Sequence, residues 1–295
     1  MVILAGIVEN FFNNFDIIKY PLLVGILLSI TAAILGVVLV LKRYSMIGDG
    51  LSHVSFGVYA IALGLGFNDI DLIFIIPLVI IAAYALLRIG ESKKLKSDAA
   101  IGLFSSSFLA IGYLVASMRH GGFTTDINSL MFGSIVFANK SDLVIMIITA
   151  VIVIGLFALL YQRIFAVTFD ESFAKATGTN TRVYNMLFAS LTAITIVIGM
   201  RIMGTLLISS IIIFPALSSM QIFKKFRNVI FFAALISVVS FLIAFFIFTE
   251  YAFGASVVCV NLVAFFICVI IGKIREYYGR HESKVIHSIH DSEEL

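Results

Sequence analysis

The chain has 295 residues, of which 61% are hydrophobic and only 13% are charged, and its formal net charge is +3. This composition is too apolar for a soluble globular protein and indicates an all-α polytopic membrane protein. The basic residues form no patch interleaved with aromatic residues, so the sequence gives no reason to expect nucleic acid as a partner.

Nine apolar runs along the chain are long enough to cross a membrane, because about 20 helical residues at about 1.5 Å each span the hydrocarbon core. We expect transmembrane helices at 20–41, 49–67, 71–88, 98–118, 141–160, 183–200, 202–222, 229–249 and 253–272. The second run starts with a polar cluster and the seventh carries Pro215. Eight spans plus a re-entrant piece is therefore the alternative.

Lys and Arg gather in the loops that follow the odd-numbered runs, which places those loops in the cytoplasm. The sequence thus predicts an extracytoplasmic segment at 1–19, a transmembrane domain at 20–272 and a cytoplasmic tail at 273–295. That tail holds His281, His287 and His290. We expect a flexible, solvated tail; the alternative is a weak metal-sensing segment.

The second run opens with a carboxylate and an imidazole inside apolar sequence. Asp49 and His53 are four residues apart, which on a helix places both on one face, with Ser52 beside them and Gly57 continuing the face with little bulk. Ionisable residues in transmembrane segments usually face a bundle interior or a water-filled cavity, so the pair is a candidate site. The alternative is structural: residues 48–50 form a turn, with Asp49 as a helix N-cap.

Two connections are too long to be simple turns. The external one, 119–141, has His120 and Asp126 as polar candidates, for which a solvated loop and a helix cap are the simpler interpretations. In the internal one, 162–181, we expect Asp170 to cap a short helix through Glu171 and Ala174 that Gly178 terminates. Such a helix in a cytoplasmic loop is a good docking surface for a partner protein.

Several enzymatic motifs are missing from the sequence. It contains no GxxxxGK[ST] phosphate loop, no HExxH and no nucleophile elbow. We therefore expect no enzymatic activity in this chain and no nucleotide hydrolysis by it.

Five segments in the same order resemble the metal-ion permeases of bacterial ABC importers, the zinc and manganese group. They are GDGLSHVSF after the first run, NSLMFGS before the fifth, FDESFAKATG in the internal loop, GTLLISSIIIFPALSS, and GASVVCVN in the last run. The resemblance runs from about residue 20 to 272. The sequence departs from the family pattern at Phe253, where a proline often precedes the glycine.

The resemblance implies an ABC importer permease of the bacterial plasma membrane that forms a homodimer with a pore on its axis. Two ATPase subunits would bind ATP on the cytoplasmic side, and an extracytoplasmic metal-binding protein would deliver the ion. By the family pattern, Asp49 and His53 would meet the ion, and Asp170, Glu171, Ala174 and Gly178 would form the helix that couples to the ATPase.

Imidazole and carboxylate ligands together suit zinc and manganese. The likeness of NSLMFGS to zinc permeases favours Zn²⁺ as the transported ion, with Mn²⁺ or iron as alternatives and no permanently bound cofactor. A permease for a metal chelate, of the siderophore or cobalamin type, is the runner-up. A transporter or membrane enzyme that works without an ATPase is a third hypothesis.

Overall fold

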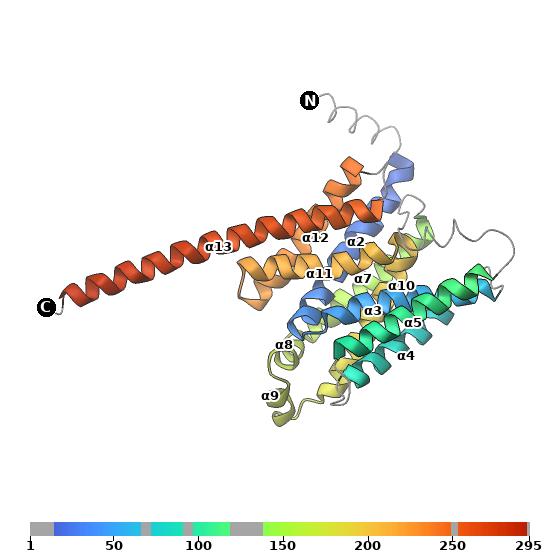
Figure 1. Cartoon of the computed structure of the whole chain (residues 1–295), viewed down its shortest axis with the longest axis horizontal. Coiled ribbons are helices and arrows are strands. Elements are labelled where there is room, and N and C mark those ends of the chain that lie inside the picture. Colours follow the sequence, from blue (N-terminus) through green and yellow to red (C-terminus); the bar gives the residue numbers. More distant parts are fainter. Residues whose placement is uncertain (1–14, 66–71, 91–96, 119–137, 249–252, 294–295) are drawn as a thin grey trace.

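The computed structural model describes residues 15–65, 72–90, 97–118, 138–248 and 253–293, and all regular elements in this part of the chain are α-helices (Figure 1). They are α2 (Phe15–Leu41), α3 (Ser45–Gly64), α4 (Leu72–Gly90), α5 (Ser97–Ser117), α7 (Lys140–Leu159), α8 (Tyr161–Phe169), α9 (Glu171–Ala176), α10 (Thr181–Met203), α11 (Thr205–Ile222), α12 (Phe226–Phe248) and α13 (Phe253–Glu293).

Eight of these helices are long and apolar enough to cross a membrane, which confirms the predicted all-α membrane architecture. The remaining run, the third (71–88), is α4, whose apolar part, Phe74–Arg88, is shorter than the other eight. The two runs in doubt, α3 and α11, are both continuous helices of spanning length. Pro215 lies inside α11 without ending it, so that run forms one unbroken helix. The chain turns instead at Gly204, whose φ of 84° favours glycine.

Helix α3 begins earlier than the sequence suggested. Its first residue is Ser45 and its N-cap is Tyr44, so Asp49 lies in the second turn of the helix. The expectation that residues 48–50 form a turn capped by Asp49 is therefore wrong. A tight turn at Arg43, with φ of 60°, separates the end of α2 from the start of α3.

Helices α3 and α5 run in the same direction and pack through glycines spaced by seven residues. A Cβ atom added at Gly50, Gly57 or Gly64 would lie 2.6, 2.3 and 2.7 Å from atoms of Ile101, Phe108 and Val115 respectively. The partners on α5 repeat with the same spacing of seven. Small residues in this pattern let two helix backbones approach closely over several turns.

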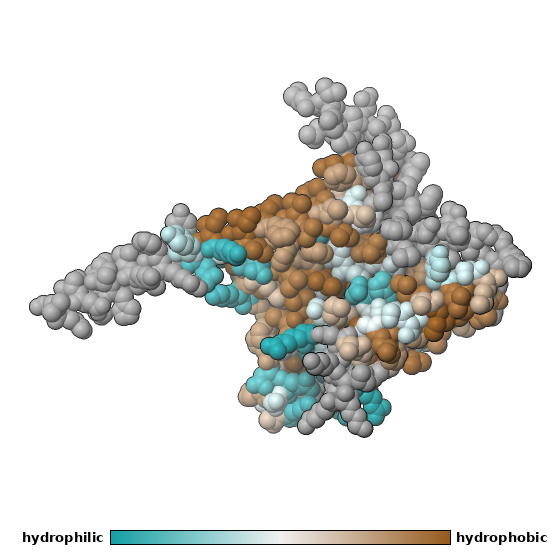
Figure 2. All heavy atoms as spheres, in the orientation of Figure 1, coloured by the Kyte–Doolittle hydropathy of each residue, from teal (hydrophilic) through white to brown (hydrophobic). Residues whose placement is uncertain are grey.

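Helices α2 and α10 lie at the centre of the bundle, and most residues of both are buried. The surface of the bundle is largely apolar, and hydrophilic residues gather around α9 and where α13 leaves the bundle (Figure 2). Helix α13 continues without a break beyond the apolar span, which ends at Tyr277, to Glu293. The backbone of the segment that the sequence assigns to a cytoplasmic tail is thus helical as far as Glu293.

Candidate functional site

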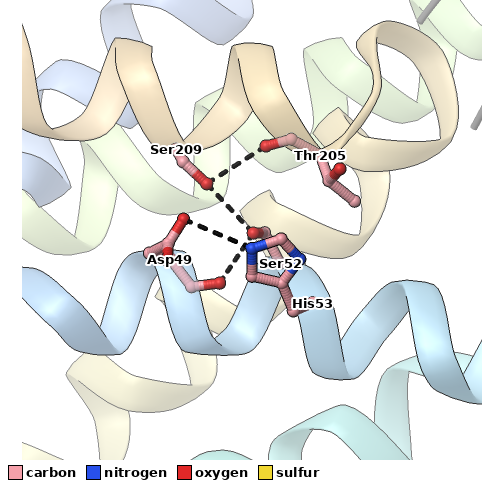
Figure 3. Close-up of polar contacts among 5 residues, drawn as sticks. All are labelled: Asp49, Ser52, His53, Thr205 and Ser209. Carbon is pink, nitrogen blue, oxygen red and sulfur yellow. Dashed lines mark hydrogen bonds and ion pairs between the residues drawn. The ribbon is translucent and has the colours of Figure 1, made fainter. Parts of the chain in front are cut away.

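The carboxylate and the imidazole of α3 lie side by side as their spacing predicts. His53 Nε2 and Asp49 Oδ1 are 3.7 Å apart, and the two side chains are 23% and 38% exposed (Figure 3). This separation is longer than a hydrogen bond, so these two atoms are not hydrogen-bonded to each other. Two ligands that each bind at about 2.1 Å can share one metal ion across such a gap.

Two hydroxyl groups connect the pair to a second helix. Ser52 Oγ donates a hydrogen bond to the Asp49 carbonyl oxygen at 2.7 Å and lies 3.0 Å from Ser209 Oγ on α11. Ser209 Oγ in turn donates to the Thr205 carbonyl oxygen at 3.1 Å (Figure 3). Ser52 is fully buried, and its contact with Ser209 holds one side of α3 against α11. Asp49 and His53 stay accessible.

Gly57 lies one turn beyond His53 on α3, where it packs against α5. It is buried, and its missing side chain is what lets the backbone of Phe108 on α5 approach. Asp49 and His53 lie about 6 and 12 Å along α3 from Ser45. The pair therefore lies nearer to the end of the bundle at which α3 begins. His53 Nδ1 is buried and has no hydrogen-bond partner among the described residues.

The short helix of the internal loop, α9, forms as predicted. The Asp170 side chain accepts a hydrogen bond from the Phe173 backbone N–H at 2.8 Å, which caps the first turn. Gly178, with φ of 83°, follows the last turn, and the Thr179 N–H donates to the Ala174 carbonyl oxygen at 2.9 Å. Ala174 is fully buried, while Phe173 is 61% exposed.

Glu171 joins α9 to the start of α10. Its Oε1 lies 2.9 Å from Lys175 Nζ and accepts a hydrogen bond from Thr181 Oγ1 at 3.1 Å. Burial alone would raise the pKa of the Glu171 carboxyl. The hydrogen bonds from Lys175 and Thr181, with the charges of Lys175 and Lys42, outweigh burial and lower the pKa below its ordinary value.

One turn further along α10, Asn185 continues this connection towards the site helix. The Lys42 ammonium donates to Asn185 Oδ1, and Asn185 is buried. Lys42 belongs to the turn between α2 and α3, in which the Tyr44 N–H donates to the Leu39 carbonyl oxygen at 2.7 Å. Glu171, Thr181, Asn185 and Lys42 therefore connect α9, through α10, to the turn from which α3 starts; we call these four residues the polar connection.

Aromatic rings attach the first part of the 162–181 connection to α12. Phe226, the first residue of α12, packs against Phe157, Tyr161, Phe165 and Phe169, which follow one another at intervals of four residues along α7 and α8. The ring centroids lie 5.4 to 6.5 Å from that of Phe226. We call these five residues the aromatic cluster. It fixes α8, and with it the start of α9, to α12.

Sequence reasoning missed four residues that the structure brings to these places: Ser209, Asn185, Phe173 and Phe226. Only Phe173 carried a local signal, as an aromatic residue in a polar loop helix. His120, Asp126 and the whole NSLMFGS segment lie outside the described residues, as do the side chains of the three tail histidines. Among the residues that the structure describes, no group of three or more His, Cys, Asp or Glu side chains could hold a metal ion.

Comparison with known proteins supports a transport role for this architecture. The profile of the ABC 3 transport family matches residues 14–272. The manganese transport system membrane protein MntC of Listeria monocytogenes serovar 1/2a is 28% identical over 274 residues, which cover 90% of this chain and 93% of that protein. The high-affinity zinc uptake system membrane protein ZnuB of Haemophilus influenzae is 27% identical over 226 residues, which cover 77% and 85%. The structure of PsaBC from Streptococcus pneumoniae in complex with Fab aligns with a TM-score of 0.79 at 27% identity, over 90% of this chain and 95% of that one.

Proposed function

The chain belongs to the ABC 3 transport family, and on that premise we propose that it is the permease subunit of an ATP-driven importer of divalent metal ions. The observation that carries this proposal is the Asp49 and His53 pair, held 3.7 Å apart on a membrane-spanning helix. ATP is bound and hydrolysed by a partner subunit, and the metal ion is cargo and not a resident cofactor.

Zinc is the ion that we propose first, because an imidazole nitrogen and a carboxylate oxygen are both common zinc ligands. Manganese is the second candidate, because MntC, which matches 90% of this chain, is named as a manganese transport protein. A transport site needs few ligands, so that the ion binds long enough to enter and weakly enough to leave. Two ligands from each protomer meet that requirement.

We further propose that two copies of the chain form a pore with Asp49 and His53 of each copy facing it. The two side chains are partly exposed on an otherwise apolar surface, on which hydrophilic spheres interrupt the area over α3 and α5 (Figure 2). An ionisable group left against lipid costs about 3 kcal/mol on the insertion scale. A second copy of the chain that packed against this face, with water enclosed between the two copies, would remove that cost.

We propose that the ATPase subunit docks on helix α9. Asp170, Glu171, Ala174 and Gly178 build the helix and attach it, and Phe173 projects from it to offer an apolar contact. A movement of α9 would reach α3 through the polar connection, because Lys42 lies in the turn that starts α3. By the distribution of Lys and Arg, this end of the bundle and the segment 273–295 face the cytoplasm. An extracytoplasmic binding protein would deliver the ion to the opposite end.

Uptake of radioactive zinc and manganese, in competition, tests the proposal in proteoliposomes that hold the chain with its ATPase and binding-protein partners. We expect ATP-dependent uptake that falls more than tenfold in Asp49→Asn and in His53→Gln. His290→Gln is the matched control, because it removes an imidazole from the tail and should leave uptake unchanged. Wild-type uptake in both site variants would refute the site. Uptake of a metal chelate without uptake of the free ion would assign the chain to the runner-up class.

A further inference from the structure

A cavity of about 510 Å³ lies between α4 and α10, at the same end of the bundle as α9, and neither Asp49 nor His53 lines it. Its lining contains two guanidinium groups, those of Arg88 in the last turn of α4 and Arg182 at the start of α10. Both side chains are exposed. None of the described residues that line the cavity is acidic, so its charge is positive.

The polar wall of the cavity is fixed by neighbours within the protein. Tyr84 and Ser190 share a hydrogen bond at 2.6 Å, which ties α4 to α10 beside the cavity. Asn185 is buried and accepts from Lys42, and Glu171 is paired with Lys175 in the adjoining cavity. Among the described residues, no carboxylate forms an ion pair with Arg88 or Arg182.

An apolar stripe on α4 runs to this cavity from the opposite end of the helix. Phe74, Leu78 and Ile81 are 69%, 53% and 63% exposed, and their spacing of four and three residues places them on one face of the helix. Ala85 and Arg88 continue the same spacing, and both line the cavity. The exposed face of α4 therefore changes from apolar side chains to the guanidinium of Arg88 within one helix, and Arg182 of α10 supplies the second cation.

We propose that this cavity binds the phosphate of an anionic phospholipid, such as phosphatidylglycerol, whose acyl chain lies along the α4 stripe. Arg88 and Arg182 supply donors that match phosphate oxygens, and Leu87 and Met186 supply the apolar wall beneath the headgroup. Asn185 lines the cavity and also belongs to the polar connection, so a bound lipid would touch the group that joins α9 to α3. The proposal goes beyond metal transport and does not depend on it.

Lipid binding to the purified full-length chain in detergent, measured by native mass spectrometry, tests this proposal without any transport reaction. We expect the chain to retain phosphatidylglycerol on the order of tenfold more strongly than phosphatidylethanolamine. The double variant R88Q/R182Q should lose this preference, and R88K/R182K should keep part of it because the charges remain. The matched control, K224Q/R227Q, removes two exposed charges at the same end of the bundle and should keep the full preference.

Three outcomes would overturn the proposal. The first is equal retention of the two lipids by the wild-type chain, and the second is an equal loss of preference in K224Q/R227Q, which would indicate general surface charge. The third is displacement of the lipid by glycerol phosphate at equal concentration, which would indicate a site for a soluble phosphate. If the preference is absent and R88Q/R182Q instead weakens binding of the ATPase subunit, the arginines belong to a protein interface.

Discussion

At the scale of single residues, Glu171 shows how a loop helix is attached to the bundle by one carboxylate. Its pKa is lowered, so the charged form is favoured in the folded protein. A group with a lowered pKa stabilises the folded state above its ordinary pKa, and that contribution is lost as the pH falls through the lowered value. Attachment of α9 should therefore be intact at neutral pH and weaken only in acid.

We predict that Glu171→Gln loosens α9 at pH 7 and that this effect fades as the pH falls through the lowered pKa of Glu171, because the wild-type carboxylate then becomes protonated. Hydrogen exchange of the α9 amides, corrected for intrinsic rates, measures this. We expect exchange several-fold faster in the variant at pH 7, with the difference narrowing as the pH is lowered below the ordinary pKa of a glutamate. A difference that stays constant over this range would mean that the charge of Glu171 does not hold the helix.

The residues that sequence reasoning predicted correctly are those whose contacts are local. Asp49 and His53 meet because helix geometry brings residues four apart together, and Asp170 caps α9 because its acceptor lies three residues from the donor. Ser209 lies 157 residues from its partner Ser52, and no sequence spacing reveals such a contact. Asp49 is not a cap because the helix starts four residues earlier, at Ser45, where the sequence carries no strong start signal.

At the scale of elements, the spacing of glycines on α3 predicts the cost of adding a methyl group. A Cβ at position 57 would lie 2.3 Å from the Phe108 carbonyl oxygen, which belongs to the backbone of α5 and cannot move aside alone. We predict that Gly57→Ala separates α3 from α5 and lowers the thermal stability of the detergent-solubilised chain by several degrees. The matched control is Gly155→Ala on α7, where no atom lies within 4 Å. Equal melting temperatures of the two variants would contradict the close packing of α3 against α5.

The aromatic cluster predicts a variant that separates ATP hydrolysis from transport. Phe226 is 5% exposed and contacts four rings, so Phe226→Ala should cost about 3 kcal/mol of local stability and release α8 from α12. We expect ATP hydrolysis by the assembled complex to continue while the metal ions moved per ATP fall several-fold. Phe231→Ala, at a position 64% exposed on the same helix, serves as the control and should leave the ratio unchanged.

The elements themselves were largely predictable, because eight of the nine apolar runs correspond to helices of spanning length. Hydrophobic runs reveal transmembrane helices since the bilayer requires internally satisfied backbone groups over a fixed thickness. The length of α13 beyond residue 272 was not predictable, because the apolar run that predicts the helix ends there and the sequence that follows is polar. The close packing of α3 on α5 was also not predicted, although the glycine spacing of seven is visible in the sequence.

At the scale of the whole molecule, the exposed pair on α3 leads to a prediction about assembly. If two copies face each other across a two-fold axis near α3, equivalent residues of the two copies lie close together. We predict that His53→Cys, in a background without Cys259 and Cys268, forms a disulfide between two chains on mild oxidation. Ile152→Cys on α7, at a position 48% exposed, should not. Equal cross-linking at both positions would point to random collision, and a native mass of one chain would exclude the dimer.

The glycine contacts between α3 and α5 extend over the length of both helices, from Gly50 to Gly64 on one and from Ile101 to Val115 on the other. Because α3 and α5 are in close contact at three positions along their length, we expect the two helices to move as a single rigid body. Any displacement of Asp49 during a transport cycle must therefore also displace α5. A spin label on an exposed residue of α5, such as Ser107, would report the motion of α3 by its changing distance to a label on α12, without altering either of the proposed metal ligands.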